Sequence, residues 1–125
     1  MIALDASALL AMLFLEPGHE RVAEVVKGSC ISAVNLSEVI GRVLRSGVAA
    51  REVYATIAAL GVEFVPFTAI EAAAAAALLP WTKPFGLSLA DRACLALAAA
   101  RRIAALTADR AWLRLEMRVK IEIIR

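Results

Sequence analysis

The sequence is poor in the residues from which many enzyme and metal sites are built. Its 125 residues include one histidine, His19, and two cysteines, Cys30 and Cys94, which lie far apart in the chain. A single histidine without a C-x-x-C pair is not typical of a structural zinc site, and it also argues against a protease-like nucleophile–histidine pair. We expect both cysteines to be small buried side chains in a reducing compartment.

Long uncharged apolar runs and a strong net charge are also missing. Hydrophobic residues make up 62% of the chain, yet no run reaches the ~18 apolar residues of a membrane span. The first fifteen residues do not resemble a signal peptide, because no basic segment opens them and Asp5 interrupts their apolar run. The net charge is only +2, so any charge that binds nucleic acid must be local. We therefore expect a cytoplasmic protein that does not bind membranes.

Aspartate is scarce, and its positions are informative. The chain has three aspartates against nine glutamates. Asp5 and Asp109 each follow a short apolar run that is typical of a buried strand, and Asp91 lies three residues after Ser88 at the start of the most apolar helical segment. Ligand sites of parallel sheets form at the carboxyl ends of strands. For Asp91 a simple helix-capping role remains an equal alternative.

Short apolar runs alternate with helical patterns, which predicts an α/β sandwich with a mostly parallel sheet of four to five strands flanked by helices. The chain length suits a single domain, residues 1–125. The expected strands are 1–4, 30–31, 62–67, 103–107 and 119–124, the last at an edge of the sheet. The expected helices are 7–15, 19–27, 33–45, 49–60, 69–79, 88–102 and 108–116. Residues 80–86 are expected to be irregular.

The helix expected at 33–45 has one apolar stripe at helical spacing. That stripe consists of Leu36, Val39, Ile40, Val43 and Leu44. Glu38 lies on the opposite side of the helix, near Asn35, Arg42 and Arg45. Periodicity alone favours a solvated face with a weak Glu38–Arg42 ion pair. The alternative is a functional Glu38 with two arginines that contact phosphates.

Four segments of the chain resemble the four acidic motifs of the PIN-domain ribonucleases. They are DASA at 5–8, NLSE at 35–38, LSLADRACLALA at 87–98 and LTADRAW at 106–112. The motifs follow the family order, span the chain from end to end, and are most similar to the VapC toxin branch of bacterial toxin–antitoxin pairs. The resemblance implies a PIN-like three-layer sandwich that hydrolyses RNA with the help of a metal ion.

The resemblance also implies roles for individual residues. Asp5 and Asp91 are the expected metal ligands, and Glu38 and Asp109 complete the catalytic cluster directly or through water. Carboxylates crowded together repel, and a ligand set made only of oxygen selects hard cations, so the expected ion is Mg²⁺ or Mn²⁺. Three further side chains are expected to orient these carboxylates or water, namely Ser7, Asn35 and Thr107.

Candidates for RNA binding flank the expected catalytic residues. They are Arg42, Arg45, Trp81, Lys83 and Arg92. An aromatic residue can stack on a base of single-stranded RNA, although Trp81 is equally well explained as an apolar anchor of its loop. The expected partners are an RNA substrate and a small VapB-like antitoxin. The high apolar content of so short a chain also predicts a homodimer.

Two other functions compete with the toxin nuclease. A receiver-type phosphoacceptor domain needs an acidic pair after its first strand and an acceptor aspartate after its third. Here the first expected strand is followed by Asp5 alone, and the third ends in Val65-Pro66-Phe67. A catalytically silent PIN-like binding module is the other alternative, and the complete set of four acids argues against it.

Overall fold

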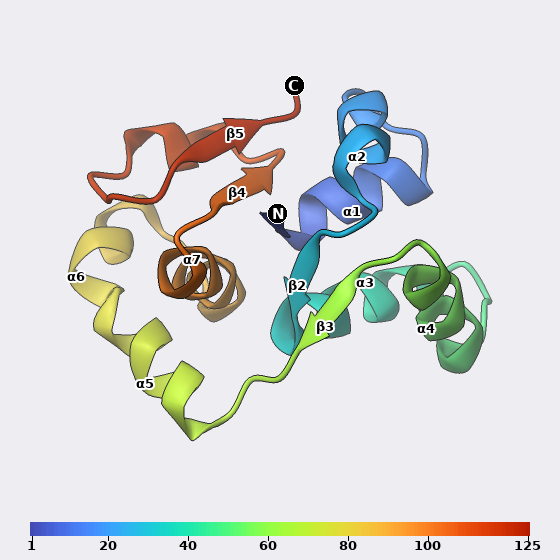
Figure 1. Cartoon of the computed structure of the whole chain (residues 1–125), viewed down its shortest axis with the longest axis horizontal. Coiled ribbons are helices and arrows are strands. Elements are labelled where there is room, and N and C mark those ends of the chain that lie inside the picture. Colours follow the sequence, from blue (N-terminus) through green and yellow to red (C-terminus); the bar gives the residue numbers. More distant parts are fainter.

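Five short parallel strands form the centre of the protein, in the spatial order β3-β2-β1-β4-β5 (Figure 1). A computed structural model describes all residues from 1 to 125. The strands are β1 (Ile2–Leu4), β2 (Cys30–Ser32), β3 (Glu63–Val65), β4 (Ala104–Thr107) and β5 (Ile121–Ile123). The last strand lies at an edge of the sheet, as its sequence predicted.

Helices cover both faces of this sheet (Figure 1). The α-helices are α1 (Ala6–Leu13), α2 (His19–Val25), α3 (Ala33–Leu44), α4 (Ala50–Ala59), α5 (Ala69–Ala77), α6 (Leu79–Thr82) and α7 (Leu89–Arg101). Two 3₁₀ helices complete the chain, η1 (Lys83–Phe85) and η2 (Arg110–Arg114). On one face α1 and α3 contact the strands, and α2 and α4 pack against them. On the other face α7 contacts the strands, and α5 packs against α7.

The side chains of the strands alternate between two hydrophobic cores, one on each face of the sheet. Successive side chains of a strand point to opposite faces of a sheet. Accordingly, Ile2 and Leu4 belong to the core beneath α1 and α3, whereas Ala3 belongs to the core beneath α7. Leu106 and Ala105 of β4 divide in the same way. A sheet buried on both faces is the rule when all its strands are parallel, and the predicted three-layer α/β sandwich is confirmed.

The strand order decides one of the alternatives raised by the sequence. Receiver domains have the order 2-1-3-4-5, whereas this sheet has the order 3-2-1-4-5. The receiver-type interpretation is therefore wrong. The order reverses between β1 and β4, and in open parallel sheets ligands bind outside the carboxyl ends of the strands at such a reversal. Leu4 lies opposite Leu106 in the register, so the residues that follow β1 and β4 are neighbours.

Two sequence expectations were wrong in the second half of the chain. Residues 80–86 are not irregular, since α6 and η1 occupy most of this stretch. Pro80 and Pro84 each stand in the first turn of a helix, where a missing amide hydrogen costs nothing. The helix expected at 108–116 is only the 3₁₀ turn η2, which begins at Arg110 after the cap residue Asp109.

Burial differs from expectation in α3 and is sparse in α5. Leu44 was assigned to the buried stripe of α3, but its side chain is 43% exposed at the end of that helix. The alanine run of α5 forms the expected helix, yet only Ala75 is buried against its neighbours. By contrast, α7 packs against both the sheet and α5, as its apolar sequence predicted. None of the helices has the length and apolarity needed to cross a membrane.

Candidate active site

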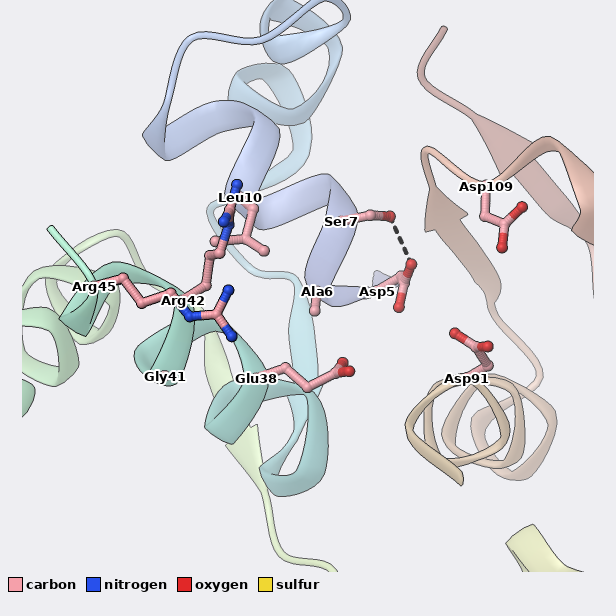
Figure 2. A pocket seen from close by; sticks show the side chains of 10 residues that line it. All are labelled: Asp5, Ala6, Ser7, Leu10, Glu38, Gly41, Arg42, Arg45, Asp91 and Asp109. Atoms are coloured by element: carbon pink, nitrogen blue, oxygen red, sulfur yellow. Dashed lines mark hydrogen bonds between the residues drawn. The ribbon is translucent and has the colours of Figure 1, made fainter. Parts of the chain in front are cut away.

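A cavity of about 570 Å³ opens at the carboxyl edge of the sheet, and four acidic side chains line it (Figure 2). Asp5 follows β1, Asp109 follows β4, Glu38 projects from α3, and Asp91 lies in the first turn of α7. The four elements converge because β1 and β4 are adjacent at the reversal of strand order and α3 and α7 flank them. The structure thus brings together the four acids from the four sequence motifs.

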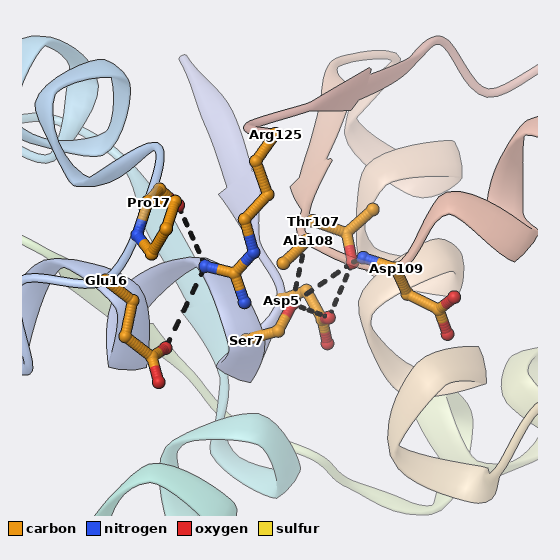
Figure 3. A network of polar contacts seen from close by, with 8 residues as sticks. All are labelled: Asp5, Ser7, Glu16, Pro17, Thr107, Ala108, Asp109 and Arg125. Atoms are coloured by element: carbon orange, nitrogen blue, oxygen red, sulfur yellow. Dashed lines mark hydrogen bonds and ion pairs between the residues drawn. The ribbon is translucent and has the colours of Figure 1, made fainter.

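Asp5 is the most enclosed of the four acids, with 5% of its surface exposed. Its Oδ2 atom accepts hydrogen bonds from the Ser7 hydroxyl at 2.6 Å and from the Thr107 hydroxyl at 2.8 Å (Figure 3). The same two hydroxyl oxygens accept the backbone amides of Ala108 and Asp109. Ser7 and Thr107 therefore fix the Asp5 carboxylate and join α1 to the turn that carries Asp109.

Burial and repulsion act on two of the carboxylates. Burial raises the pKa of Asp5, and the nearby Asp91 carboxylate raises it further, although the Ser7 and Thr107 hydroxyls partly oppose these effects. Burial also raises the pKa of Glu38, with added repulsion from Asp5 and Asp91. Both shifts mean that the hydrogen bonds to these two carboxylates compensate only part of the cost of ionising them.

The side chains of Asp91 and Asp109 accept hydrogen bonds from backbone amides at the starts of α7 and η2. The Ser88 amide donates to Asp91 Oδ2 at 2.8 Å, and the Ser88 hydroxyl accepts the Asp91 amide, which is a complete capping box. Asp109 Oδ1 accepts the amide of Ala111 at the start of η2. The capping expectation for Asp91 is confirmed, but it does not exclude a functional role, because Asp91 also lines the cavity.

Asn35 ties α3 to the first turn of α7. Its side chain is fully buried, and Nδ2 donates to the carbonyl oxygen of Ala90 at 2.9 Å. Ala90 directly precedes Asp91, and Asn35 lies one turn before Glu38. This hydrogen bond therefore sets the position of Glu38 relative to Asp91.

Two arginines of α3, Arg42 and Arg45, line the same cavity. The Arg42 guanidinium lies over the ring of Phe14, 6.0 Å from its centroid. The Glu38–Arg42 ion pair allowed by the sequence does not form. None of the ion pairs in the protein involves any of the four cavity carboxylates.

The donor set suits a hard divalent cation. No three of the chain's histidine, cysteine, aspartate and glutamate side chains form a ready-made chelating group. Mg²⁺ does not require one, because it keeps several waters and is held by one or two carboxylates. Asp5 is almost fully buried without a cationic partner, so a cation in the cavity would relieve the effects that raise its pKa. The residues present therefore fit such an ion.

Three candidate RNA-binding residues lie outside this cavity. Trp81 is half exposed on α6, and Lys83 is exposed on η1. Arg92 is partly buried, and its Nη1 donates to the carbonyl of Ala75 on α5. Arg92 thus joins α7 to α5. A role in RNA binding stays a prediction for all three.

The sequence reasoning missed Gly41, which also lines the cavity. Glycine within a helix costs roughly 1 kcal/mol relative to alanine, and a Cβ atom at position 41 would meet no atom within 4 Å. Gly41 lies one turn after Glu38, on the same side of α3 as Arg42. A glycine at this helical spacing from a motif acid was the signal available in the sequence.

Comparisons with known proteins bear on the fold and the family of this chain. The family model of the PIN domain matches residues 2–116. A toxin–antitoxin complex from Klebsiella pneumoniae is similar in fold, with a TM-score of 0.76 at 16% identity over 100% of this chain and 98% of that one. DNA-bound VapBC from Salmonella typhimurium gives a TM-score of 0.70 at 19% identity, covering 99% and 98% of the two chains.

VapBC2 from Rickettsia felis, bound to a DNA fragment from its promoter, gives a TM-score of 0.69 at 18% identity, covering 98% of each chain. A comparison with curated protein sequences found no match. At these identities the solved structures support the fold alone. The family model spans nearly the whole sequence, including all four acidic segments, and the chain therefore belongs to the PIN-domain family.

Proposed function

We propose that the protein is a metal-dependent endoribonuclease and the toxin of a type II toxin–antitoxin pair, of the VapC kind. The observation that carries this proposal is the cavity in which Asp5, Glu38, Asp91 and Asp109 face one another without a cationic partner. PIN-domain nucleases generally use divalent metal ions. The similar solved structures include toxin–antitoxin complexes, which supports the toxin branch of the family.

Each carboxylate has a distinct part in this proposal. Asp5 and Asp91 hold Mg²⁺ or Mn²⁺, and Glu38 and Asp109 complete the cluster directly or through water. The bound ion supplies neutralisation of the carboxylates, a more acidic water and stabilisation of charge on the phosphodiester. Ser7 and Thr107 favour the ionised form of Asp5 against the effect of burial and fix the orientation of its carboxylate, because both hydroxyls donate to it.

The substrate is held by groups at the rim of the cavity. Arg42 and Arg45 line the cavity on its α3 side (Figure 2) and take part in no ion pair, so both can contact phosphates of the RNA. Trp81, Lys83 and Arg92 remain candidates for contacts further along the RNA. A cation bound between the acidic centre and the basic rim would weaken the repulsion between the carboxylates and a phosphodiester.

The proposed partners are a second copy of the chain and a small VapB-like antitoxin. The antitoxin offers an arginine or lysine to the acidic cavity and an apolar segment to the surface near α3. Neutralising the four carboxylates by a protein cation instead of a metal ion would switch the nuclease off.

Incubation of the purified protein with RNA tests the central claim. Cleavage is expected in Mg²⁺ or Mn²⁺ and none in EDTA, with activity restored when metal is added back. Cleavage that persists in EDTA, or no cleavage under any metal condition, would contradict the proposal. The second outcome would favour the catalytically silent binding module.

A further inference from the structure

A second concave surface lies at the amino edge of the sheet, opposite the acidic cavity. It encloses about 590 Å³ between the end of α7, the start of β4 and the segment that precedes β5. Arg102, Arg118 and Lys120 line it, and the other six lining residues are apolar. No acidic residue contributes to it. We call this surface the basic concavity.

The connection from β4 to β5 links the two edges. Because β4 and β5 are parallel, residues 108–120 must return from the carboxyl edge, where Asp109 lies, to the amino edge. This connection carries Arg110, Arg114, Arg118 and Lys120, and all four side chains are exposed. Glu116 is the only acid between Arg110 and Lys120.

Charge is unevenly divided along the chain. Residues 101–125 contain seven arginines and lysines against three acids, a net charge of +4. Residues 1–100 contain seven against nine, a net charge of −2. The small overall charge therefore conceals a strongly basic C-terminal fifth.

Most of these cations have no ionic partner. Arg102, Arg114 and Arg118 take part in no ion pair, and Arg110 donates only to the backbone carbonyl of Arg125. Lys120 lies 3.6 Å from Glu122, but that carboxylate is already bound by Arg21 at 2.8 Å. The dipole of α7 favours a cation at its C-terminus and accounts for Arg102. It does not account for the cations of the β4–β5 connection.

We propose that the β4–β5 connection and the basic concavity bind the phosphate backbone of single-stranded RNA that extends out of the acidic cavity. This inference rests on the proposed ribonuclease function. The path begins at Arg110, which is adjacent in sequence to the cavity residue Asp109, and ends at the concavity. Cations there contact phosphates, as in the positively charged grooves that follow the backbone of single strands, and the aliphatic floor offers apolar contact to a base. Continuity with the acidic cavity favours RNA over an acidic polypeptide.

Binding measured without cleavage tests the proposal. Fluorescence anisotropy in EDTA compares RNAs of about 6 and about 30 nucleotides, at several salt concentrations. The test variant is Arg102→Gln/Arg118→Gln. The control is Lys27→Gln/Arg51→Gln, which removes the same charge from two exposed cations that take part in no ion pair. Arg118→Gln alone changes a side chain without a bonding partner and guards against misfolding of the double variant.

For the long RNA we expect the test variant to lose about fivefold or more in affinity, with a salt slope shallower by ~1.4 for two lost phosphate contacts. The control variant should lose less than about twofold in affinity for the long RNA. With the short RNA, the affinities of the test and control variants should differ far less. Equal losses in test and control variants, or an unchanged salt slope, would overturn the proposal. So would a wild-type protein that binds poly-glutamate but not the long RNA. Because binding is measured separately from cleavage, a failure of this proposal can be distinguished from a failure of the proposed nuclease activity.

Discussion

The hydroxyl group of Thr107 donates a 2.8 Å hydrogen bond to the carboxylate of Asp5, 102 residues away in sequence. The same oxygen accepts the backbone amide of Asp109 at 3.1 Å. One buried side chain therefore orients the most enclosed acid of the cavity and fixes the turn that presents another. The strand order makes this possible, because it places the ends of β1 and β4 side by side.

Replacing this hydroxyl by a methyl group should harm both stability and activity. Thr107→Val keeps the shape of the side chain but leaves the Asp109 amide without its acceptor, at a cost of about 1–3 kcal/mol in the free energy of unfolding. Cleavage of RNA should fall by roughly 10- to 100-fold, as is typical when a group that orients a metal ligand is lost. Denaturant unfolding and a cleavage assay in Mg²⁺ measure the two effects.

Thr82→Val provides the matched control. Thr82 is also fully buried, its hydroxyl donates to the carbonyl of Leu78, and it does not line the acidic cavity. This variant should lose stability of a similar order, about 1 kcal/mol, and keep its cleavage rate. Equal losses of activity in the two variants would mean that Thr107 acts only through stability.

Replacing the carboxylates of Asp5 or Asp91 by amides should abolish cleavage. In Asp91→Asn the new side chain keeps an oxygen that accepts the Ser88 amide, so α7 should remain capped. Glu71→Gln is the matched control, since Glu71 holds the same capping-box position on α5 and lies outside the acidic cavity. Full activity of either purified aspartate variant would remove that residue from the set of metal ligands.

The layered fold and the positions of the three aspartates were predictable from local patterns, whereas Glu38 was singled out only by the resemblance to PIN ribonucleases. Apolar runs and helical periodicity predicted the five strands and the helices α1 to α5 and α7, and the three aspartates lie at the ends of such segments. The capping boxes at Thr68 and Ser88 were equally local, since three residues separate the partners in each. The resemblance to PIN ribonucleases predicted that the four acids form one site.

The features that could not be predicted from the sequence depend on contacts between segments that are distant in the chain. Nothing near Arg92 in the sequence shows that its guanidinium meets the Ala75 carbonyl on another helix. Residues 80–86 were expected to be irregular, whereas Pro80 and Pro84 each stand in the first turn of a helix. Only the folded sheet shows that Thr107 reaches Asp5, or that Gly41 leaves open space beside Glu38.

A substitution at Gly41 tests whether RNA occupies the part of the acidic cavity beside this residue. Gly41→Ala should raise stability by up to ~1 kcal/mol, because alanine favours the helix and the added Cβ meets nothing within 4 Å. If RNA occupies the cavity beside α3, the same change should raise the KM for RNA. Thr56→Ala on the exposed side of α4 is the control for helix propensity. A more stable variant with an unchanged KM would show that RNA does not approach Gly41.

The partner proposal predicts a homodimer that retains a small antitoxin. Leu44 on α3 and Trp81 on α6 are 43% and 50% exposed and are the residues proposed to contact apolar parts of the antitoxin, whereas Leu36 is buried and cannot do so. Trp81→Ser should reduce antitoxin retention in co-purification, whereas Leu113→Ser, at a site 54% exposed on η2, should not. A monomer by light scattering at micromolar concentration, with no partner from the native host, would contradict this prediction.

The last prediction uses stability to test whether Asp5 belongs to a crowded carboxylate cluster. The Asp5 side chain makes no capping hydrogen bond to α1, and an asparagine oxygen can still accept from Ser7 and Thr107. Removing the charge relieves burial of an ionised group and its repulsion with Asp91. Without metal, Asp5→Asn should therefore be more stable than wild type by on the order of 1 kcal/mol near neutral pH.

The pH dependence follows from the direction of the pKa shift. Burial, aided by Asp91, raises the folded-state pKa of Asp5 above its unfolded value of about 3.9. Between these two values the folded protein binds more protons than the unfolded chain, so the stability of the wild type falls as pH rises through that window. The variant should lose less, because it has no proton to release at position 5. Mg²⁺ should stabilise the wild type by mass action and affect the variant weakly. Thermal melting of both proteins in EDTA and in Mg²⁺, at acid and neutral pH, measures these differences. Equal melting temperatures in EDTA together with equal responses to Mg²⁺ would show that Asp5 is only a structural residue.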